Sequence, residues 1–85
     1  MFEFLVTSEF SRTLEALEKA AHALVKDKLR FLEMASDPLS FAKRLKGYRD
    51  IFRFRAGNYR IVFRLEKQKI ILLTVKDRKD IYEGF

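Results

Sequence analysis

Two short segments with alternating apolar and basic residues constrain this chain most, because they fix which side chains share a surface. Residues 51–56 read IFRFRA and residues 59–64 read YRIVFR, with Gly57 and Asn58 between them. Side chains alternate between the two faces of a β-strand, and a Gly-Asn pair favours a hairpin turn. The pattern predicts a hairpin with one apolar face and one arginine face. The residues of the arginine face are Arg53, Arg55, Arg60 and Arg64.

Two further strands and two helices complete the predicted fold. Residues 2–6 alternate like a first strand, and residues 69–76 are nearly all apolar, as in a strand buried on both faces. Between residues 10 and 35, apolar side chains recur every three or four positions, which predicts helix. We expect a helical hairpin with Ser8 as N-cap and a break near residues 19–21, because one helix of that length is unusual in so small a domain.

The predicted order is β-α-α-β-β-β, an α+β domain over residues 1–85. Its helical hairpin packs on one face of a small, mostly antiparallel twisted sheet. A basic connection at 39–50 leads from the helices to the last three strands. Those strands are expected at about 51–56, 59–66 and 69–76. In the last strand, alternation directs three residues into the core and leaves Lys76 at the end of the arginine face. The three core residues are Ile71, Leu73 and Val75.

Charge is divided unevenly along the chain. Residues 1–39 carry five basic and seven acidic side chains, whereas residues 40–85 carry thirteen basic and five acidic ones. This asymmetry predicts that the second half binds an anion, either a nucleic-acid backbone or an acidic protein segment. Two alternatives stay open: separately solvated arginines, or a subunit interface that uses the same charge.

The composition argues against several function classes. The chain has no cysteine, which excludes disulfides, cysteine-based metal sites and cysteine nucleophiles. Its one histidine, His22, lies in a predicted helix without neighbours in sequence that suggest a catalytic triad or a metal site. No apolar run approaches the ~20 residues that span a bilayer. We therefore expect a cytoplasmic protein without a metal or cofactor.

The chemistry that this composition leaves is that of arginine, lysine and tyrosine, which suits phosphodiester chemistry on RNA. Guanidinium groups pair with phosphate oxygens and stabilise the charge that develops in a transition state. A tyrosine stacks on a base or positions a hydroxyl group.

Three short motifs, in this order, resemble those of the RelE/ParE toxin superfamily, and of its RelE-like branch most of all. They are RLKG at 44–47, GNYRIVF at 57–63 and RKDIY at 78–82. The resemblance covers essentially the whole chain. It implies the toxin of a type II toxin–antitoxin system, a metal-independent endoribonuclease (mRNA interferase). Such toxins cleave messenger RNA in the ribosomal A site and inhibit translation. The implied reaction is attack of a 2′-hydroxyl on the adjacent phosphorus, which leaves a 2′,3′-cyclic phosphate and a 5′-hydroxyl.

The resemblance also implies which residues act. Arg60 is implied to stabilise the transition-state phosphate, and Tyr82 to stack on the base or orient the 2′-hydroxyl. The implied catalytic set is Arg53, Arg55, Arg60, Lys76, Arg78 and Tyr82. The surrounding basic residues are expected to contact RNA, and they are Lys43, Arg44, Lys46, Arg64 and Lys79.

Departures from the family pattern bear on the chemistry. Arg53 and Arg55 stand where RelE has lysines, and because arginine keeps its proton they are poor general bases. Lys76 is then the best lysine for that role, although its position matches a helper of the leaving group. Asp77 stands where many relatives have a histidine, whose donor role an acid cannot duplicate. The other candidates for the base are Tyr82, Glu83 and a group of the ribosome.

The implied partners are a RelB-like antitoxin, in a hetero-oligomeric complex, and the ribosome with its messenger RNA; no membrane is involved. Two other functions stay open. A ParE-like toxin that poisons DNA gyrase shares the fold without needing the catalytic set. A non-catalytic RNA- or ribosome-binding relative would fit the arginines at the lysine positions.

Overall fold

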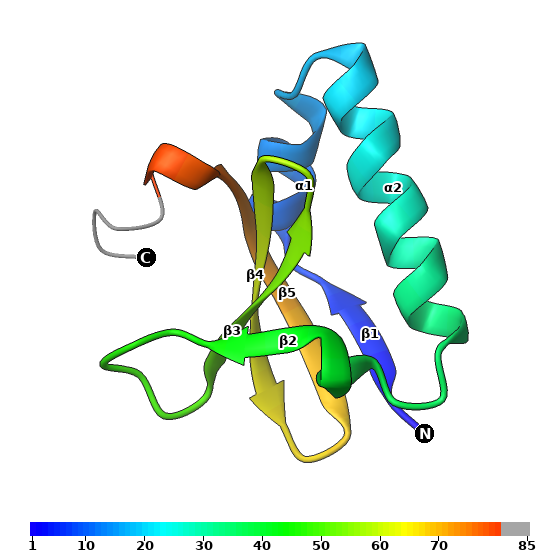
Figure 1. The fold of residues 1–85 in the computed structure, drawn as a ribbon, viewed down its shortest axis with the longest axis vertical. Helices are drawn as coiled ribbons and strands as arrows, with labels where there is room; N and C mark the ends of the chain where they lie inside the picture. The colour runs from blue at the N-terminus through cyan, green and yellow to red at the C-terminus, as the bar shows by residue number, and fades with distance from the viewer. Residues whose placement is uncertain (81–85) are drawn as a thin grey trace.

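A five-stranded sheet with two helices packed on one face forms the structure, a computed structural model that describes residues 1–80 (Figure 1). In chain order the elements are β1 (Glu3–Val6), α1 (Ser8–Glu15), α2 (Lys19–Met34), the 3-10 helix η1 (Pro38–Phe41), β2 (Ala42–Arg44), β3 (Ile51–Ala56), β4 (Tyr59–Glu66), β5 (Lys69–Asp77) and the 3-10 helix η2 (Arg78–Asp80). The sheet order is β1-β5-β4-β3-β2. Strand β1 runs parallel to β5, and the other neighbours are antiparallel. The predicted α+β order is confirmed, with the short strand β2 added inside the connection predicted at 39–50.

The two helices begin and end close to the predicted positions, with two differences. Thr7, not Ser8, caps α1, because its hydroxyl accepts a hydrogen bond from the Phe10 amide (3.1 Å). The break between the helices lies at residues 16–18, just before the predicted 19–21, where the Leu17 amide donates to the Leu14 carbonyl in a tightened last turn (3.1 Å). Within residues 1–80, neither helix combines the length and the apolar character that crossing a membrane requires.

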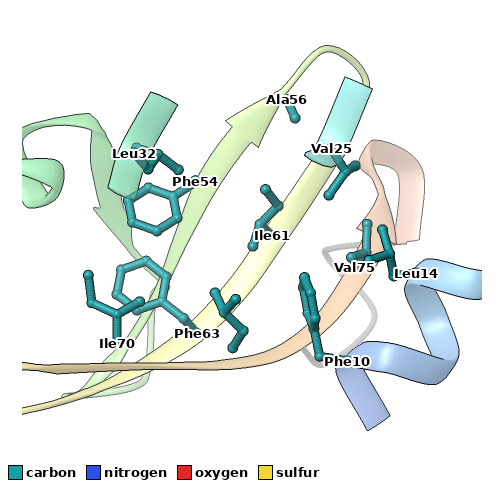
Figure 2. Close-up of a cluster of buried hydrophobic side chains, with 11 residues drawn as sticks. Phe10, Leu14, Val25, Leu32, Phe54, Ala56, Ile61, Phe63, Ile70 and Val75 are labelled. Atoms are coloured by element: carbon teal, nitrogen blue, oxygen red, sulfur yellow. The ribbon is translucent and has the colours of Figure 1, made fainter. Parts of the chain in front are cut away.

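Stacked aromatic rings fill the space between the helices and the sheet. Phe54 and Phe63 lie on neighbouring strands with their ring centroids 4.4 Å apart, and both are fully buried. Figure 2 shows Phe10 of α1 and Val25 of α2 in the same buried cluster. Burying each large side chain contributes roughly 1.5–3 kcal/mol. The apolar face of the predicted hairpin is thus the floor of the core.

Strand β5 contains an irregularity that reverses its alternation. Val62 is opposite Thr74 but Phe63 is opposite Leu72, so Leu73 is an extra residue in β5. Ile70 and Leu72 therefore point into the main core, whereas Leu73 packs on the opposite face. The prediction that Ile71 and Leu73 join the core is wrong for this reason, and the prediction for Val75 is confirmed.

Helix α1 also supports the outer edge of β5. Strand β1 ends at Val6, which is opposite Leu72, so the rest of this edge of β5 has no strand beside it in residues 1–80. There the Val75 amide donates to the Thr13 hydroxyl (3.1 Å), and the Thr7 hydroxyl donates to the Leu72 carbonyl (2.7 Å). These bonds fix the part of β5 that leads to Lys76.

Candidate RNA-binding and catalytic site

Three cations form a row across the sheet face that the helices leave uncovered. Arg60 of β4 is directly opposite Arg55 of β3 and Lys76 of β5. Directly opposite residues point to the same face, and neighbouring strands lie ~4.8 Å apart, so the row spans roughly 10 Å. We call these three residues the cationic row. All three lie on the arginine face, as the alternation predicted.

A second row lies two positions further along the strands. Arg53 is directly opposite Lys43 of β2 and Val62 of β4, and Val62 is opposite Thr74 of β5. Two residues of a strand span roughly 6.6 Å, so Arg53 and Lys43 lie close to the cationic row. Arg53 is half-buried and Lys43 is exposed. Both therefore add positive charge beside the cationic row.

Arg60 is the most constrained of these cations. Only 6% of its surface is exposed. Its Nη1 lies 3.3 Å from the Gly57 carbonyl oxygen and 3.3 Å from that of Tyr59, so the guanidinium is tied to the β3–β4 turn. An oriented charge in a partly desolvated site interacts more strongly with an anion than a solvated one does, because the effective dielectric constant is lower.

The same turn anchors the start of η2. The Arg78 amide donates to the Asn58 carbonyl (2.7 Å), so the β3–β4 turn contacts both Arg60 and the segment that follows β5. Arg78 and Lys79 are exposed. The structure therefore brings the start of the RKDIY motif to the end of the sheet at which the β3–β4 turn and Arg60 lie. Tyr82 and Glu83 lie outside the described residues.

Asp77 does not join the cationic row. It is directly opposite Tyr59, whose side chain packs against the main core, so the register directs Asp77 toward the helix side of the sheet. Its Oδ1 accepts a hydrogen bond from the Lys79 amide (3.2 Å). Asp77 thus stabilises the turn into η2.

Three of the predicted RNA contacts lie away from the row. Arg64 is opposite Ile51, four residues and roughly 13 Å along the strand from Arg60, and its Nε lies 3.2 Å from Glu66 Oε2. Arg44 is opposite Phe52 and therefore belongs to the core-facing side of the edge strand. Lys46 lies in the loop between β2 and β3, where it is exposed.

An apolar cluster on the arginine face was not predicted from the sequence. Ile51 and Val62 are buried there, with Leu45 and Leu73 packed against them. In the sequence, the position of Val62 between Arg60 and Arg64 was the one indication of this cluster. The bulge that brings Leu73 to the same face cannot be recognised from the sequence. The cluster separates the cationic row from Arg64 and gives the site an uncharged floor.

The sequence and the fold can be compared with known proteins. A family model described as the ParE toxin of the type II toxin–antitoxin system parDE matches residues 5–82. The chain belongs to this family. The ParE toxin family is part of the RelE/ParE superfamily, so the resemblance inferred from the three motifs is confirmed.

Individual relatives of this ParE-family chain agree with a RelE-like fold. Toxin RelE3 of Methanocaldococcus jannaschii is 44% identical over 43 residues, a match that spans 51% of this chain and 49%, about half, of that relative. The RelB-RelE antitoxin-toxin complex from Methanococcus jannaschii contains a chain that is 27% identical with a TM-score of 0.74, covering 95% of this chain and 98% of that one. The RelBE2 toxin-antitoxin complex from Mycobacterium tuberculosis contains a chain that is 24% identical with a TM-score of 0.73. This match covers 91% of the present chain and 98% of the other.

Proposed function

We propose that this ParE-family protein is the toxin of a type II toxin–antitoxin system and that it cleaves messenger RNA in the ribosomal A site. The observation that carries the proposal is the cationic row, Arg55, Arg60 and Lys76, on a face that the helices leave open. Like charges placed directly opposite each other destabilise a sheet. A bound polyanion would remove the repulsion among the three charges of this row and so stabilise the protein. A phosphodiester suits this role, because two of its oxygens match the two N–H groups that a guanidinium presents.

In the proposed reaction the scissile phosphate binds against Arg60, with Arg55 and Arg53 on its flanks. The 2′-oxygen forms a bond to phosphorus, and the bond from phosphorus to the 5′-oxygen breaks. Arg60 stabilises the charge that builds on the phosphate oxygens. Lys76 gives a proton to the leaving 5′-oxygen, and the proton of the 2′-hydroxyl passes to Tyr82, Glu83 or a ribosomal group. The products are a 2′,3′-cyclic phosphate and a 5′-hydroxyl.

We also propose a RelB-like antitoxin as the partner of the protein in the cytoplasm. The solved relatives that are complexes of RelE with RelB support this partner. An acidic or amphipathic antitoxin segment would neutralise the surplus charge of the open face, which the +6 net charge of the chain makes favourable.

Primer extension on a message bound to a programmed ribosome tests the proposed cleavage. The wild-type protein should give a new stop in the A-site codon, and Arg60→Ala should lower the cleavage rate by roughly 10²–10³-fold, as expected for the loss of one transition-state donor. Arg64→Ala is the matched control, because Arg64 is ion-paired with Glu66 at the other end of the strand, and it should cleave within a few-fold of wild type. Equal cleavage by wild type and Arg60→Ala would refute the assigned role.

A ParE-like gyrase poison is the second candidate, because the matching family model is that of ParE toxins. The same experiment separates the candidates. A protein that neither binds nor cleaves on programmed ribosomes, but traps gyrase on DNA, is ParE-like in function. Ribosome binding without cleavage would indicate a non-catalytic relative in which Arg53 and Arg55 no longer support the reaction.

A further inference from the structure

The turn between β3 and β4 contacts α2 as well as the cationic row. A Cβ added at Gly57 would lie 2.8 Å from Leu24 Cδ2, so the end of the Leu24 side chain occupies the space beside this glycine. The residues that follow Leu24 and precede Gly57, Val25 and Ala56, are both buried in the main core (Figure 2). Helix α2 is therefore held beside the end of β3, and Leu24 extends from it onto the turn.

The same turn holds the guanidinium group of Arg60. The carbonyl oxygens of Gly57 and Tyr59 each lie 3.3 Å from Arg60 Nη1. Gly57 has a φ of 60° and no side chain, so its backbone rotates more easily than that of other residues unless neighbouring atoms restrict it. The Leu24 side chain is such a neighbour. A line of contacts thus runs from Leu24 through Gly57 to Arg60.

Leu24 contributes little to the core of the protein. Its side chain is 44% exposed, and it belongs to neither apolar cluster formed by residues 1–80. Shortening this side chain therefore removes little buried apolar surface, but it opens the space beside Gly57. The contact with the turn is the feature of Leu24 that distinguishes it from the other exposed apolar residues of α2.

We propose that Leu24 is a positioning residue, which restricts the Gly57 peptide group and so fixes the direction of the Arg60 guanidinium. This inference rests on the proposed RNA cleavage and adds to its machinery a residue that does not touch the RNA. A fixed charge is effective only when it points at the atoms that react, and a displacement of about 1 Å lowers a rate by roughly 10²-fold. Leu24 thus acts on the reaction from the helix side of the sheet.

Single-turnover cleavage on programmed ribosomes tests this role. Leu24→Ala should lower the cleavage rate by roughly 10- to 100-fold, whereas its binding to the ribosome should change by no more than a few-fold. Leu24→Met refills the space beside Gly57 and should cleave within about threefold of wild type. Leu24→Val, which is shorter by one carbon, should lie between wild type and Leu24→Ala.

Phe31→Ala is the matched control. Phe31 is exposed to a similar extent (48%) and lies about two turns further along the same helix. Its ring packs on Phe41 of η1, with the centroids 5.0 Å apart, and not on the β3–β4 turn. Phe31→Ala should therefore cleave within about threefold of wild type. Equal losses of cleavage in Leu24→Ala and Phe31→Ala would overturn the proposal, because they would reflect a general loosening of α2.

NMR of the Arg60 side chain gives a second measurement, which needs no RNA. The order parameter of the Arg60 Nε–Hε group should be lower in Leu24→Ala than in wild type, Leu24→Met or Phe31→Ala, because the guanidinium moves more freely. An unchanged order parameter in Leu24→Ala, or full cleavage by this variant, overturns the proposal. A wild-type protein that does not cleave, together with a mobile Arg60 in Leu24→Ala, would refute the proposed reaction and support the positioning of Arg60 by Leu24.

Discussion

Arg60 and Lys76 are directly opposite each other on β4 and β5, so a guanidinium and an ammonium group project from adjacent positions of one sheet face. Arg60 is buried and held by the carbonyls of Gly57 and Tyr59, whereas Lys76 is only half-buried. The two cations differ in chemistry, because arginine keeps its proton and lysine is able to give one up. The pair therefore joins a fixed positive charge to a proton donor.

Replacing Lys76 separates its charge from its proton. Lys76→Arg keeps the positive charge of the row but cannot supply a proton readily, so we expect cleavage on ribosomes to fall by about 10²–10⁴-fold, the usual contribution of general acid catalysis. Ribosome binding by this variant should change by no more than a few-fold. Single-turnover cleavage rates and ribosome-binding constants, measured for the variant and for wild type, separate the effect on cleavage from the effect on binding. Full cleavage activity in Lys76→Arg would show that Lys76 acts only through its charge.

Removing a charge from the cationic row should make the fold more stable. In Arg55→Gln the like-charge repulsion opposite Arg60 is lost, and we expect a gain of about 0.5–1 kcal/mol. For a domain of this size, 1 kcal/mol corresponds to a Tm change of ~4–8 °C. The gain should shrink in high salt, because ions screen the repulsion. Thermal unfolding followed by circular dichroism measures both effects.

Arg12→Gln is the control for the Arg55 experiment. Arg12 is exposed and lies 3.6 Å from Glu9, so its loss removes a weak attraction rather than a repulsion, and Tm should not rise. A similar rise in both variants would mean that the effect comes from net charge and not from the row.

The β3–β4 turn should favour glycine at position 57. Gly57 has a φ of 60°, which costs other residues roughly 1–2 kcal/mol, and an added Cβ would lie 2.8 Å from Leu24 Cδ2. Gly57→Ala should therefore lower the free energy of unfolding by about 1–2 kcal/mol in urea titration. Leu24→Ala in the same chain relieves the contact but not the backbone strain. Complete rescue by Leu24→Ala would show that the contact, and not φ, sets the cost.

Thr7 should be worth more than an ordinary helix cap. Its hydroxyl accepts from the Phe10 amide and donates to the Leu72 carbonyl, so it joins α1 to β5 as well as capping the helix. Thr7→Val keeps the shape and loses both bonds, and we expect a loss of about 1–3 kcal/mol in the free energy of unfolding. Thr7→Ser keeps the hydroxyl and should recover most of it. Equal stability of the Val and Ser variants would contradict this role.

The sequence alone determined four of the five strands and, within β3 and β4, which side chains share a face. Alternation with a period of two is a local property, so IFRFRA and YRIVFR predict the apolar and arginine faces of β3 and β4 without knowledge of their neighbours. The three motifs likewise indicate the RelE/ParE superfamily, because they are read from the chain itself.

Only the tertiary structure decided how β4 and β5 align. The two-residue turn at Gly57 and Asn58 already favours Arg55 opposite Arg60, whereas Lys76 joins the row only because of the bulge in β5. The extra residue Leu73 shows why this matters, since one inserted position moves every following side chain of β5 to the other face. Burial of Arg60 was equally hidden, because the carbonyls of Gly57 and Tyr59 accept from its side chain only after the hairpin has formed.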